Sequence, residues 1–278
     1  MTQQVGHEGR PDEGRFLEVA VETARAAGAL LRERLGRVRA EYKSSRTDLV
    51  TEADRASEAL ILHRLREAFP QHAFWGEESG QGGAGGGGGY RWLVDPLDGT
   101  TNYVHGLPIF AVSIALERQG ELVVGVVYQP VTEELFTAVR GRGAWLNGEP
   151  IRVSSVDRLE ESLLVTGFPY DAEAAGGDNM DHFVQFSRRC HAVRRLGSAA
   201  LDLAYVAAGR FDAYWEVGVN PWDWGAGVLL VQEAGGRVTD FRGRPLALQR
   251  RQVVASNGRI HDRVLEVLRL GTTGWREG

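Results

Sequence analysis

Two aspartates at the end of a predicted strand have the clearest chemical potential in this chain. The apolar residues Trp92 to Val94 lead into Asp95, and Asp98 and Gly99-Thr100 follow within a short turn. Open α/β sheets bind their ligands at the carboxyl ends of the strands. Carboxylate oxygens suit hard cations such as Mg²⁺, and turn N–H groups suit phosphate. The segment therefore predicts both halves of a metal-assisted phosphate site.

A second acidic pair, Glu77-Glu78, follows the short predicted strand from Ala73 to Trp75, just as Asp95 follows its own strand. Parallel neighbouring strands would bring the two acidic ends together. Carboxylates crowded in this way destabilise one another unless protons or cations neutralise them. The combination indicates a metal site.

Two further aspartates each have a simpler explanation. Asp54 completes a capping box with Thr51, and Asp223 stands where a first-turn charge stabilises a helix. Their value as site residues comes from their combination with the other carboxylates. Ser198, in Gly197-Ser198-Ala199-Ala200, is a predicted N-cap whose helix N-terminus could face an anion or a polyol.

Lys43 is the only lysine of the chain. An arginine-rich composition explains why lysine is scarce, but not why the one lysine lies here. Lysine is a compact point charge that arginine replaces poorly at a tight anion or metal site. Lys43 is therefore a candidate for a loop near the chemistry.

Two other phosphate-binding designs fit less well. Gly83, Gly85 and Gly88 spell a dinucleotide fingerprint, but that motif needs a strand before it and a helix after it. We expect residues 81–89 to form a mobile surface loop instead. The Asp95 segment also resembles the nucleophile loop of the haloacid dehalogenase superfamily, but its aspartates are separated by two residues rather than one. That superfamily also uses a basic residue, usually lysine, downstream of the loop, whereas the only lysine here lies upstream.

The overall composition sets limits. Of the 278 residues, 43% are hydrophobic, which suffices for a large core in one domain or two fused lobes. A net charge of -5 gives no electrostatic case for nucleic-acid binding. The single cysteine, Cys190, excludes an internal disulfide. With no signal-peptide pattern and no membrane-length apolar run, we expect a cytoplasmic protein.

Periodicity predicts an α/β protein with a mixed sheet. Helices are expected over residues 14–36, 51–69, 180–189, 222–234 and 260–270, with one starting at residue 198. Strands are expected over residues 73–75, 90–94, 111–117, 122–128, 135–139, 143–146, 163–166, 193–196, 211–215 and 253–256. A polar loop is expected over residues 37–48.

Together the motifs resemble the inositol monophosphatase family over roughly residues 14–260. The segments that carry the resemblance are Asp48-Leu49-Val50-Thr51-x-x-Asp54, Gly76-Glu77-Glu78-Ser79, Asp95 to Asn102, Gly197 to Ala200, Glu216, Trp222-Asp223 and Glu233 to Gly236. The resemblance implies a layered α/β/α/β/α sandwich with mixed sheets, a homodimer, and Mg²⁺-dependent hydrolysis of a phosphomonoester. Residues 1–150 would carry the metal motifs and residues 151–278 the phosphate and polyol side of one compact catalytic unit.

The resemblance also implies a role for each site residue. Glu77, Asp95 and the Leu97 carbonyl would hold one ion. Asp95, Asp98 and Asp223 would hold a second, with a third more weakly bound at Glu77 through water. Asp54 and Thr100 would activate the attacking water, and the Gly99 and Thr100 N–H groups would bind phosphate. Ser198, Ala199, Glu216 and Asp223 would contact the substrate, and Lys43 would lie on a mobile loop over the metals.

The expected substrate is a small polyol phosphate, with myo-inositol 1-phosphate favoured because Glu216 can accept hydrogen bonds from vicinal hydroxyls. Histidinol phosphate, fructose 1,6-bisphosphate and nucleotide 3′-phosphates remain alternatives, and Arg194-Arg195 is a possible basic pocket for a bisphosphate. A more distant alternative is a non-enzymatic regulator associated with transcription or RNA.

Overall fold

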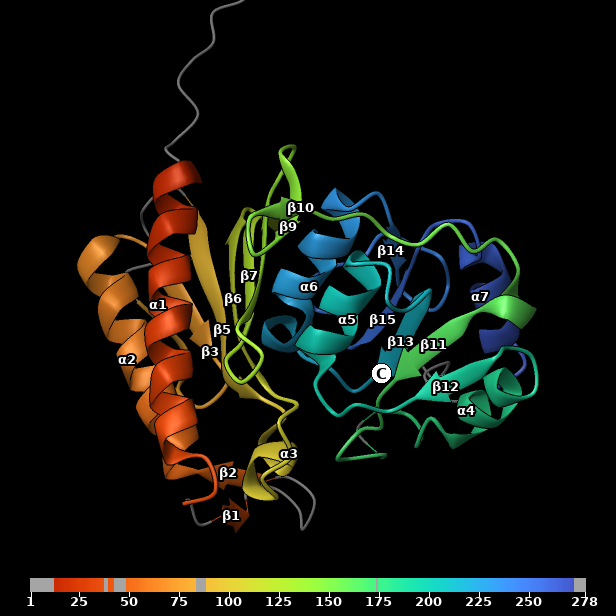
Figure 1. The fold of residues 1–278 in the computed structure, drawn as a ribbon, viewed down its shortest axis with the longest axis horizontal. Helices are drawn as coiled ribbons and strands as arrows, with labels where there is room; N and C mark the ends of the chain where they lie inside the picture. The colour runs from red at the N-terminus through yellow and green to blue at the C-terminus, as the bar shows by residue number, and fades with distance from the viewer. Residues whose placement is uncertain (1–12, 38–39, 43–48, 84–88, 174, 273–278) are drawn as a thin grey trace, which may run out of the picture.

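A computed structural model describes residues 13–37, 40–42, 49–83, 89–173 and 175–272 of the chain. Its elements stack in five layers (Figure 1): α1 with α2, an eight-stranded sheet, α5 with α6, a five-stranded sheet, and α4 with α7. The arrangement confirms the predicted layered α/β/α/β/α sandwich with mixed sheets. None of the helices in the described ranges is long and apolar enough to span a membrane.

The helices are α1 (Glu13–Arg34), α2 (Glu52–Ala68), α3 (Thr100–Val104), α4 (Met180–Ser187), α5 (Ala199–Ala207), α6 (Pro221–Glu233) and α7 (His261–Leu268), with a 3-10 turn at Leu159–Glu161. The strands of the first half are β1 (Ala40–Tyr42), β2 (Leu49–Thr51), β3 (Ala73–Gly76), β4 (Gly80–Gly83), β5 (Tyr90–Asp98), β6 (Ala111–Arg118), β7 (Glu121–Gln129), β8 (Glu134–Val139), β9 (Gly143–Leu146) and β10 (Glu149–Pro150). The second half adds β11 (Leu163–Thr166), β12 (Ala192–Arg194), β13 (Ala213–Val217), β14 (Arg237–Thr239) and β15 (Gln252–Ser256).

The larger sheet has the order β10-β9-β8-β7-β6-β5-β3-β4, and its one parallel pair is β3 with β5. Trp92, Leu93 and Val94 of β5 are all fully buried. A strand covered on both faces reads as a continuous apolar run, as this one does. The smaller sheet has the order β12-β11-β13-β15-β14, in which β11 is parallel to both β12 and β13.

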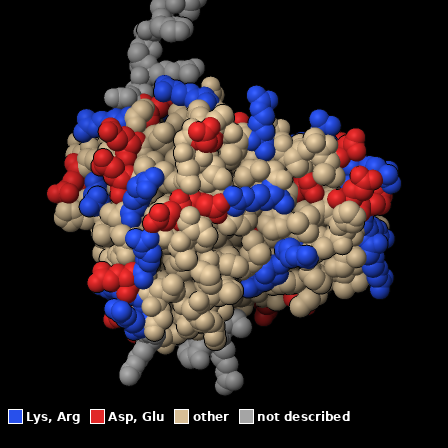
Figure 2. Space-filling view, in the orientation of Figure 1, with Lys and Arg blue, Asp and Glu red and all other residues tan. Residues whose placement is uncertain are grey.

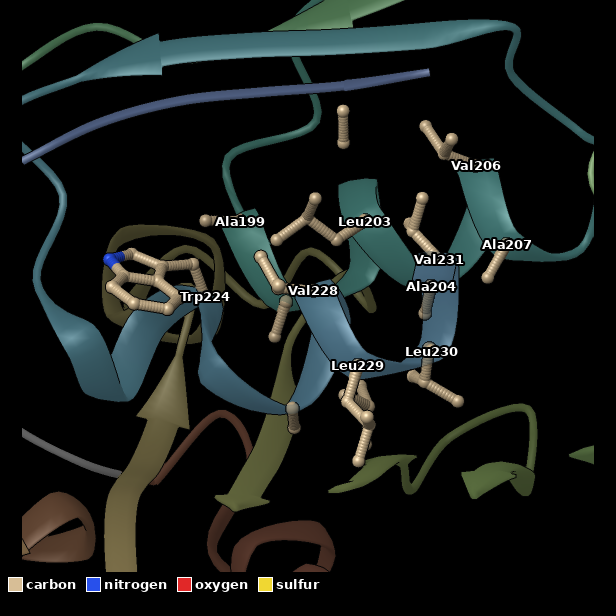
Figure 3. Close-up of a cluster of buried hydrophobic side chains, with 14 of the residues drawn as sticks. Ala199, Leu203, Ala204, Val206, Ala207, Trp224, Val228, Leu229, Leu230 and Val231 are labelled. Carbon is tan, nitrogen blue, oxygen red and sulfur yellow. The ribbon is translucent and has the colours of Figure 1, made fainter. Parts of the chain in front are cut away.

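Helices α5 and α6 fill the space between the two sheets (Figure 3). Small residues let them approach closely: a Cβ added to Gly227 would lie 2.4 Å from the Leu203 Cβ. Their core continues into both sheets, through Phe136 of β8 and Tyr214 of β13. The two halves of the chain therefore share one hydrophobic core.

The structure corrects two predicted loops. The polar segment 37–48 contains strand β1, which pairs with β2, and the glycine tract begins with β4, an edge strand paired with β3. Glycine has a low strand propensity, but an edge strand needs only its backbone to pair on one side. Lys43, Asp48 and residues 84–88 lie outside the described residues.

Three strands differ in smaller ways from the sequence-based prediction. Strand β13 runs two residues further than expected, which places Glu216 inside the strand. Strands β10 and β14 were not predicted at all. Both are no more than three residues long, too short to show a periodicity.

Candidate active site

The acidic loops meet because β3 and β5 run parallel. Gly76 pairs with Val94, and the Glu77 N–H continues the ladder by donating to the Val94 carbonyl at 3.1 Å. Glu77 therefore leaves its strand at the level where Asp95 begins the next turn. The juxtaposition predicted from the sequence is present.

The turn after Asp95 interrupts the pairing of β5 with β6. The register is regular up to Asp95 and shifts before Asp98. Within the turn, the Leu97 N–H donates to Asp95 Oδ1 at 3.0 Å. The irregularity lets two carboxylates separated by two residues both face the same side of the sheet edge.

Thr100 links this turn to helix α2. Its hydroxyl lies 2.9 Å from Asp54 Oδ1 and 3.1 Å from the Leu97 carbonyl. The second Asp54 oxygen accepts from the Thr51 N–H at 2.8 Å and the Thr51 hydroxyl at 2.6 Å. Asp54 thus completes the predicted capping box of α2. It is also buried behind Thr100, so Asp54 can influence a substrate only through the Thr100 hydroxyl.

Ser198 is the N-cap of α5, as predicted, but the anion that the N-terminus of this helix faces is the chain's own Asp98 rather than a bound ligand. Asp98 Oδ2 accepts from the Ser198 hydroxyl at 2.6 Å and from the Ala200 N–H at 2.7 Å. The Ala199 N–H lies 3.3 Å from Asp98 Oδ1. A carboxylate at a helix N-terminus is favourable because the first N–H groups have no partner within the helix.

Asp223 and Glu216 complete the acidic wall from the second half of the chain. Asp223 closes the capping box of α6, since its Oδ2 accepts from the Asn220 N–H at 2.7 Å. Glu216 projects from β13, and the Tyr214 hydroxyl donates to it at 2.8 Å. Gly167 leaves the space it needs, because a Cβ there would lie 2.0 Å from Glu216 Oε1.

These side chains line one cavity of about 310 Å³ between the two sheets. Of the predicted site residues that the structure describes, Asp54 does not line it, because it lies behind Thr100. Lys43 lies outside the described residues. The predicted residues that do line it are Glu77, Asp95, Leu97, Asp98, Gly99, Thr100, Ser198, Ala199, Glu216 and Asp223.

The cavity strongly disfavours negative charge. Burial, and then repulsion from Glu77, Asp98 and Asp223, raises the pKa of Asp95 well above its usual value. Burial and Glu77 do the same to the pKa of Asp223. Burial raises the pKa of Asp98 to about 6, against the opposing hydrogen bond from Ser198. Protonation or a bound cation would relieve the repulsion between these carboxylates.

The donor set fits a hard divalent cation. Every predicted ligand offers oxygen, from Glu77, Asp95, Asp98, Asp223 and the Leu97 carbonyl, and such ligands suit Mg²⁺, Ca²⁺ or Mn²⁺. Among the described residues, no three of these side chains stand together as a complete ligand group. Asp95, Asp98 and Asp223 are instead held by N–H or O–H donors of their own loops and of α5.

Sequence reasoning missed Asp202 as a cavity residue. It lies four residues after Ser198 on α5 and is 1% exposed, and its Oδ1 has no hydrogen-bond partner among the described residues. Helical spacing would have placed it on the same face as Ser198. Arg251 also lines the cavity, as does Arg195, which the sequence indicated only as part of a possible basic pocket.

Comparison with known proteins assigns the chain to a family. A profile of the inositol monophosphatase family matches residues 12–271. The chain belongs to this family, as the sequence motifs predicted, and is thereby a phosphoric monoester hydrolase.

Individual relatives cover almost the whole chain. The chain is 48% identical over 261 residues to a Pseudomonas aeruginosa protein named Nus factor SuhB, covering 91% of this chain and 95% of that one. It is 46% identical over 254 residues to the inositol-1-monophosphatase of Synechocystis, with 91% and 88% covered. Among solved structures, an inositol monophosphatase from Anabaena has a TM-score of 0.83 at 46% identity, with 92% and 96% covered.

Proposed function

We propose that this protein is a Mg²⁺-dependent phosphomonoesterase that hydrolyses a small polyol phosphate, with myo-inositol 1-phosphate as the preferred substrate. The observation that carries the proposal is the meeting of Glu77, Asp95, Asp98 and Asp223 in one cavity beside Thr100. A phosphate dianion would be repelled by this wall alone, so the function requires cations.

The proposed ligands form two overlapping sets that share Asp95. We propose that Glu77, Asp95 and the Leu97 carbonyl hold one Mg²⁺, and that Asp95, Asp98 and Asp223 hold a second; a third would be bound at Glu77 through water. Bound ions would lower the pKa of a water molecule, neutralise phosphate oxygens and stabilise the leaving alkoxide. Residues 1–150 then supply most of the metal ligands and residues 151–278 the alcohol side of one catalytic unit.

The chain's own groups position the reactants. Asp54 orients the Thr100 hydroxyl at 2.9 Å, and this hydroxyl directs the attacking water and accepts its hydrogen bond. Backbone N–H groups at Gly99 and Thr100 would bind phosphate oxygens at the turn. Glu216, oriented by Tyr214, accepts hydrogen bonds from the alcohol, while Ser198 and Ala199 border the same space.

Phosphate release from a substrate panel tests the proposal. The panel contains myo-inositol 1-phosphate, histidinol phosphate, fructose 1,6-bisphosphate and a nucleotide 3′-phosphate, each assayed with Mg²⁺ and with EDTA. We expect turnover only with Mg²⁺, fastest on myo-inositol 1-phosphate, and its loss in Asp95→Asn. Equal turnover in EDTA would refute the metal-dependent mechanism, and a different best substrate would correct the substrate assignment.

A second candidate is a regulatory role, favoured by the relative named Nus factor SuhB. On the face shown in Figure 2, basic and acidic side chains are interspersed, which fits a protein partner better than direct binding to nucleic acid. Pull-down with wild-type protein and Asp95→Asn distinguishes the two functions. A partner bound by wild-type protein that itself shows no phosphatase activity on any substrate would favour the regulator.

The proposed assembly is the homodimer that the family resemblance implies. Size-exclusion chromatography with light scattering measures it directly. A mass near 30.5 kDa, that of one chain, would refute it.

A further inference from the structure

One turn of helix α2 holds both acidic loops of the site without lining the cavity. Asp54, Ser57 and Glu58 are spaced three and four residues apart, so their side chains leave one face of the helix. Asp54 contacts Thr100, and the Ser57 hydroxyl donates to the Pro96 carbonyl at 2.9 Å. These two contacts fix the loop that carries Asp95 and Asp98.

Glu58 reaches the other loop. Its Oε2 accepts from the Glu78 N–H at 2.9 Å, and its Oε1 accepts from the Ser79 N–H at 2.8 Å. Glu58 is only 4% exposed, so both bonds are shielded from water. Hydrogen bonds to a charged acceptor are about twice as strong as neutral ones. The pair therefore fixes the backbone immediately after Glu77.

Gly76 makes room for this carboxylate on the other side of Glu77. A Cβ at Gly76 would lie 2.6 Å from Glu58 Oε2, so a side chain there would force the Glu58 carboxylate to move. Gly76 is not among the glycines with a positive φ, so its backbone alone would tolerate alanine. The glycine of the Gly-Glu-Glu-Ser segment is thus explained by its contact with Glu58.

We propose that Glu58 is a positioning residue of the metal site, which holds the Glu77 loop so that the Glu77 carboxylate meets Asp95 around a divalent cation. The backbone of Glu77 is then fixed on both sides: its own N–H donates to the Val94 carbonyl, and the following N–H, that of Glu78, donates to Glu58. The inference rests on the proposed metal-dependent function. Loss of a residue that orients a metal ligand typically lowers metal affinity by about 10- to 100-fold.

Calorimetric titration of the full-length protein with Mn²⁺ tests this role directly, without any substrate. Glu58→Gln keeps the size of the side chain but turns an N–H group toward a backbone N–H. Gly76→Ala displaces the same carboxylate from the opposite element. We expect both variants to bind Mn²⁺ about 10- to 100-fold more weakly than wild type.

The matched control is Glu67→Gln, on the same helix and with the same loss of charge. Glu67 is 71% exposed and pairs with His63 on the surface, more than two helical turns beyond Glu58, so Mn²⁺ affinity should not change. In phosphatase assays the Mg²⁺ concentration for half-maximal rate should rise in Glu58→Gln by the same factor, while KM for substrate at saturating Mg²⁺ stays at the wild-type value.

The outcomes separate the inference from the function beneath it. A folded wild type that takes up no Mn²⁺ would refute the metal-dependent function before any variant is compared. Wild-type affinity in Glu58→Gln and Gly76→Ala, even with a lowered melting temperature, would overturn the positioning role. If Glu58→Gln does not fold, Gly76→Ala alone decides between these outcomes, because its change is on a different element.

Discussion

Asp202 is the buried carboxylate with no evident structural purpose. Within the part of the chain that the structure describes, its Oδ1 has no hydrogen-bond partner, and burial together with repulsion from Glu216 and Asp98 raises its pKa well above the usual value. An unsatisfied buried polar group costs about 1–3 kcal/mol of stability. A group that lowers stability and lines the cavity is typical of residues retained for function.

Asp202→Asn should therefore stabilise the fold in a pH-dependent manner. Because the folded-state pKa is raised, the unfolded chain releases this proton first as pH rises, and wild-type stability falls above the unfolded pKa. Asparagine cannot ionise, so the variant should be more stable than wild type at pH 7, and the gain should shrink toward pH 3, where Asp202 is protonated in both the folded and the unfolded chain. Urea denaturation of both proteins at pH 7 and pH 3 measures the difference in their free energies of unfolding. An equal gain at both pH values would contradict a raised pKa for Asp202.

Glu216 should control which alcohol is accepted. Burial raises the pKa of Glu216 to about 7, so its carboxylate is charged in alkaline assay buffer. A hydrogen bond to a charged group is worth about 1.5–3 kcal/mol, so at such a pH Glu216→Gln should lower kcat/KM for myo-inositol 1-phosphate by roughly 10- to 100-fold. The rate on p-nitrophenyl phosphate, whose alcohol has no neighbouring hydroxyls, should change little. Tyr214→Phe, which removes the bond that orients Glu216, should shift selectivity in the same direction. A uniform loss on both substrates would show that Glu216 acts on the phosphate instead.

At the scale of elements, the sequence predicted what periodicity and motifs encode. The helices around residues 14–36 and 222–234 and the parallel acidic strand ends could be read directly. Strands β1 and β4 could not, because their pairing partners rather than their own residues stabilise them. Glu58 was missed for a related reason: it lies on an ordinary amphipathic helix, and only tertiary packing shows which loop it faces. Asp202 was missed although its helical spacing from Ser198 indicates a shared face.

At the contact between α5 and α6, helix propensity and side-chain packing should change the free energy of unfolding in opposite directions when Gly227 is replaced by alanine. Replacing a helical glycine with alanine usually stabilises a helix by about 0.5–1 kcal/mol. At Gly227 the new Cβ would lie 2.4 Å from the Leu203 Cβ, and overpacking costs about 1–3 kcal/mol. We expect Gly227→Ala to lower the free energy of unfolding measured in urea.

A second variant separates the two effects. In the Leu203→Gly background the clashing Cβ is absent, so adding Gly227→Ala should be neutral or stabilising, and the double-mutant cycle should show strong coupling. Additive effects would mean that the two helices adjust their separation without cost.

At the scale of the molecule, the shared core decides whether the two halves are separate domains. Leu93 and Phe136 from the first sheet belong to the same buried cluster as Tyr214 and Val253 from the second, joined through α5 and α6. The cavity is likewise built from both halves, since Glu77 and Asp95 line it together with Asp223. A chain built in this way should lose both sheets, and the site with them, in one transition.

We therefore predict a single cooperative unfolding transition, with calorimetric and van't Hoff enthalpies in agreement. Val254→Ala provides the sharper test, because this fully buried valine lies in the second sheet, within the cluster against α7. Hydrogen exchange of amides in β6 and in β15 should then report the same loss of global stability, although β6 is in the other sheet. If only β15 lost protection, the halves would unfold independently, and the cavity residues from 1–150 and 151–278 would be held together by the interface alone.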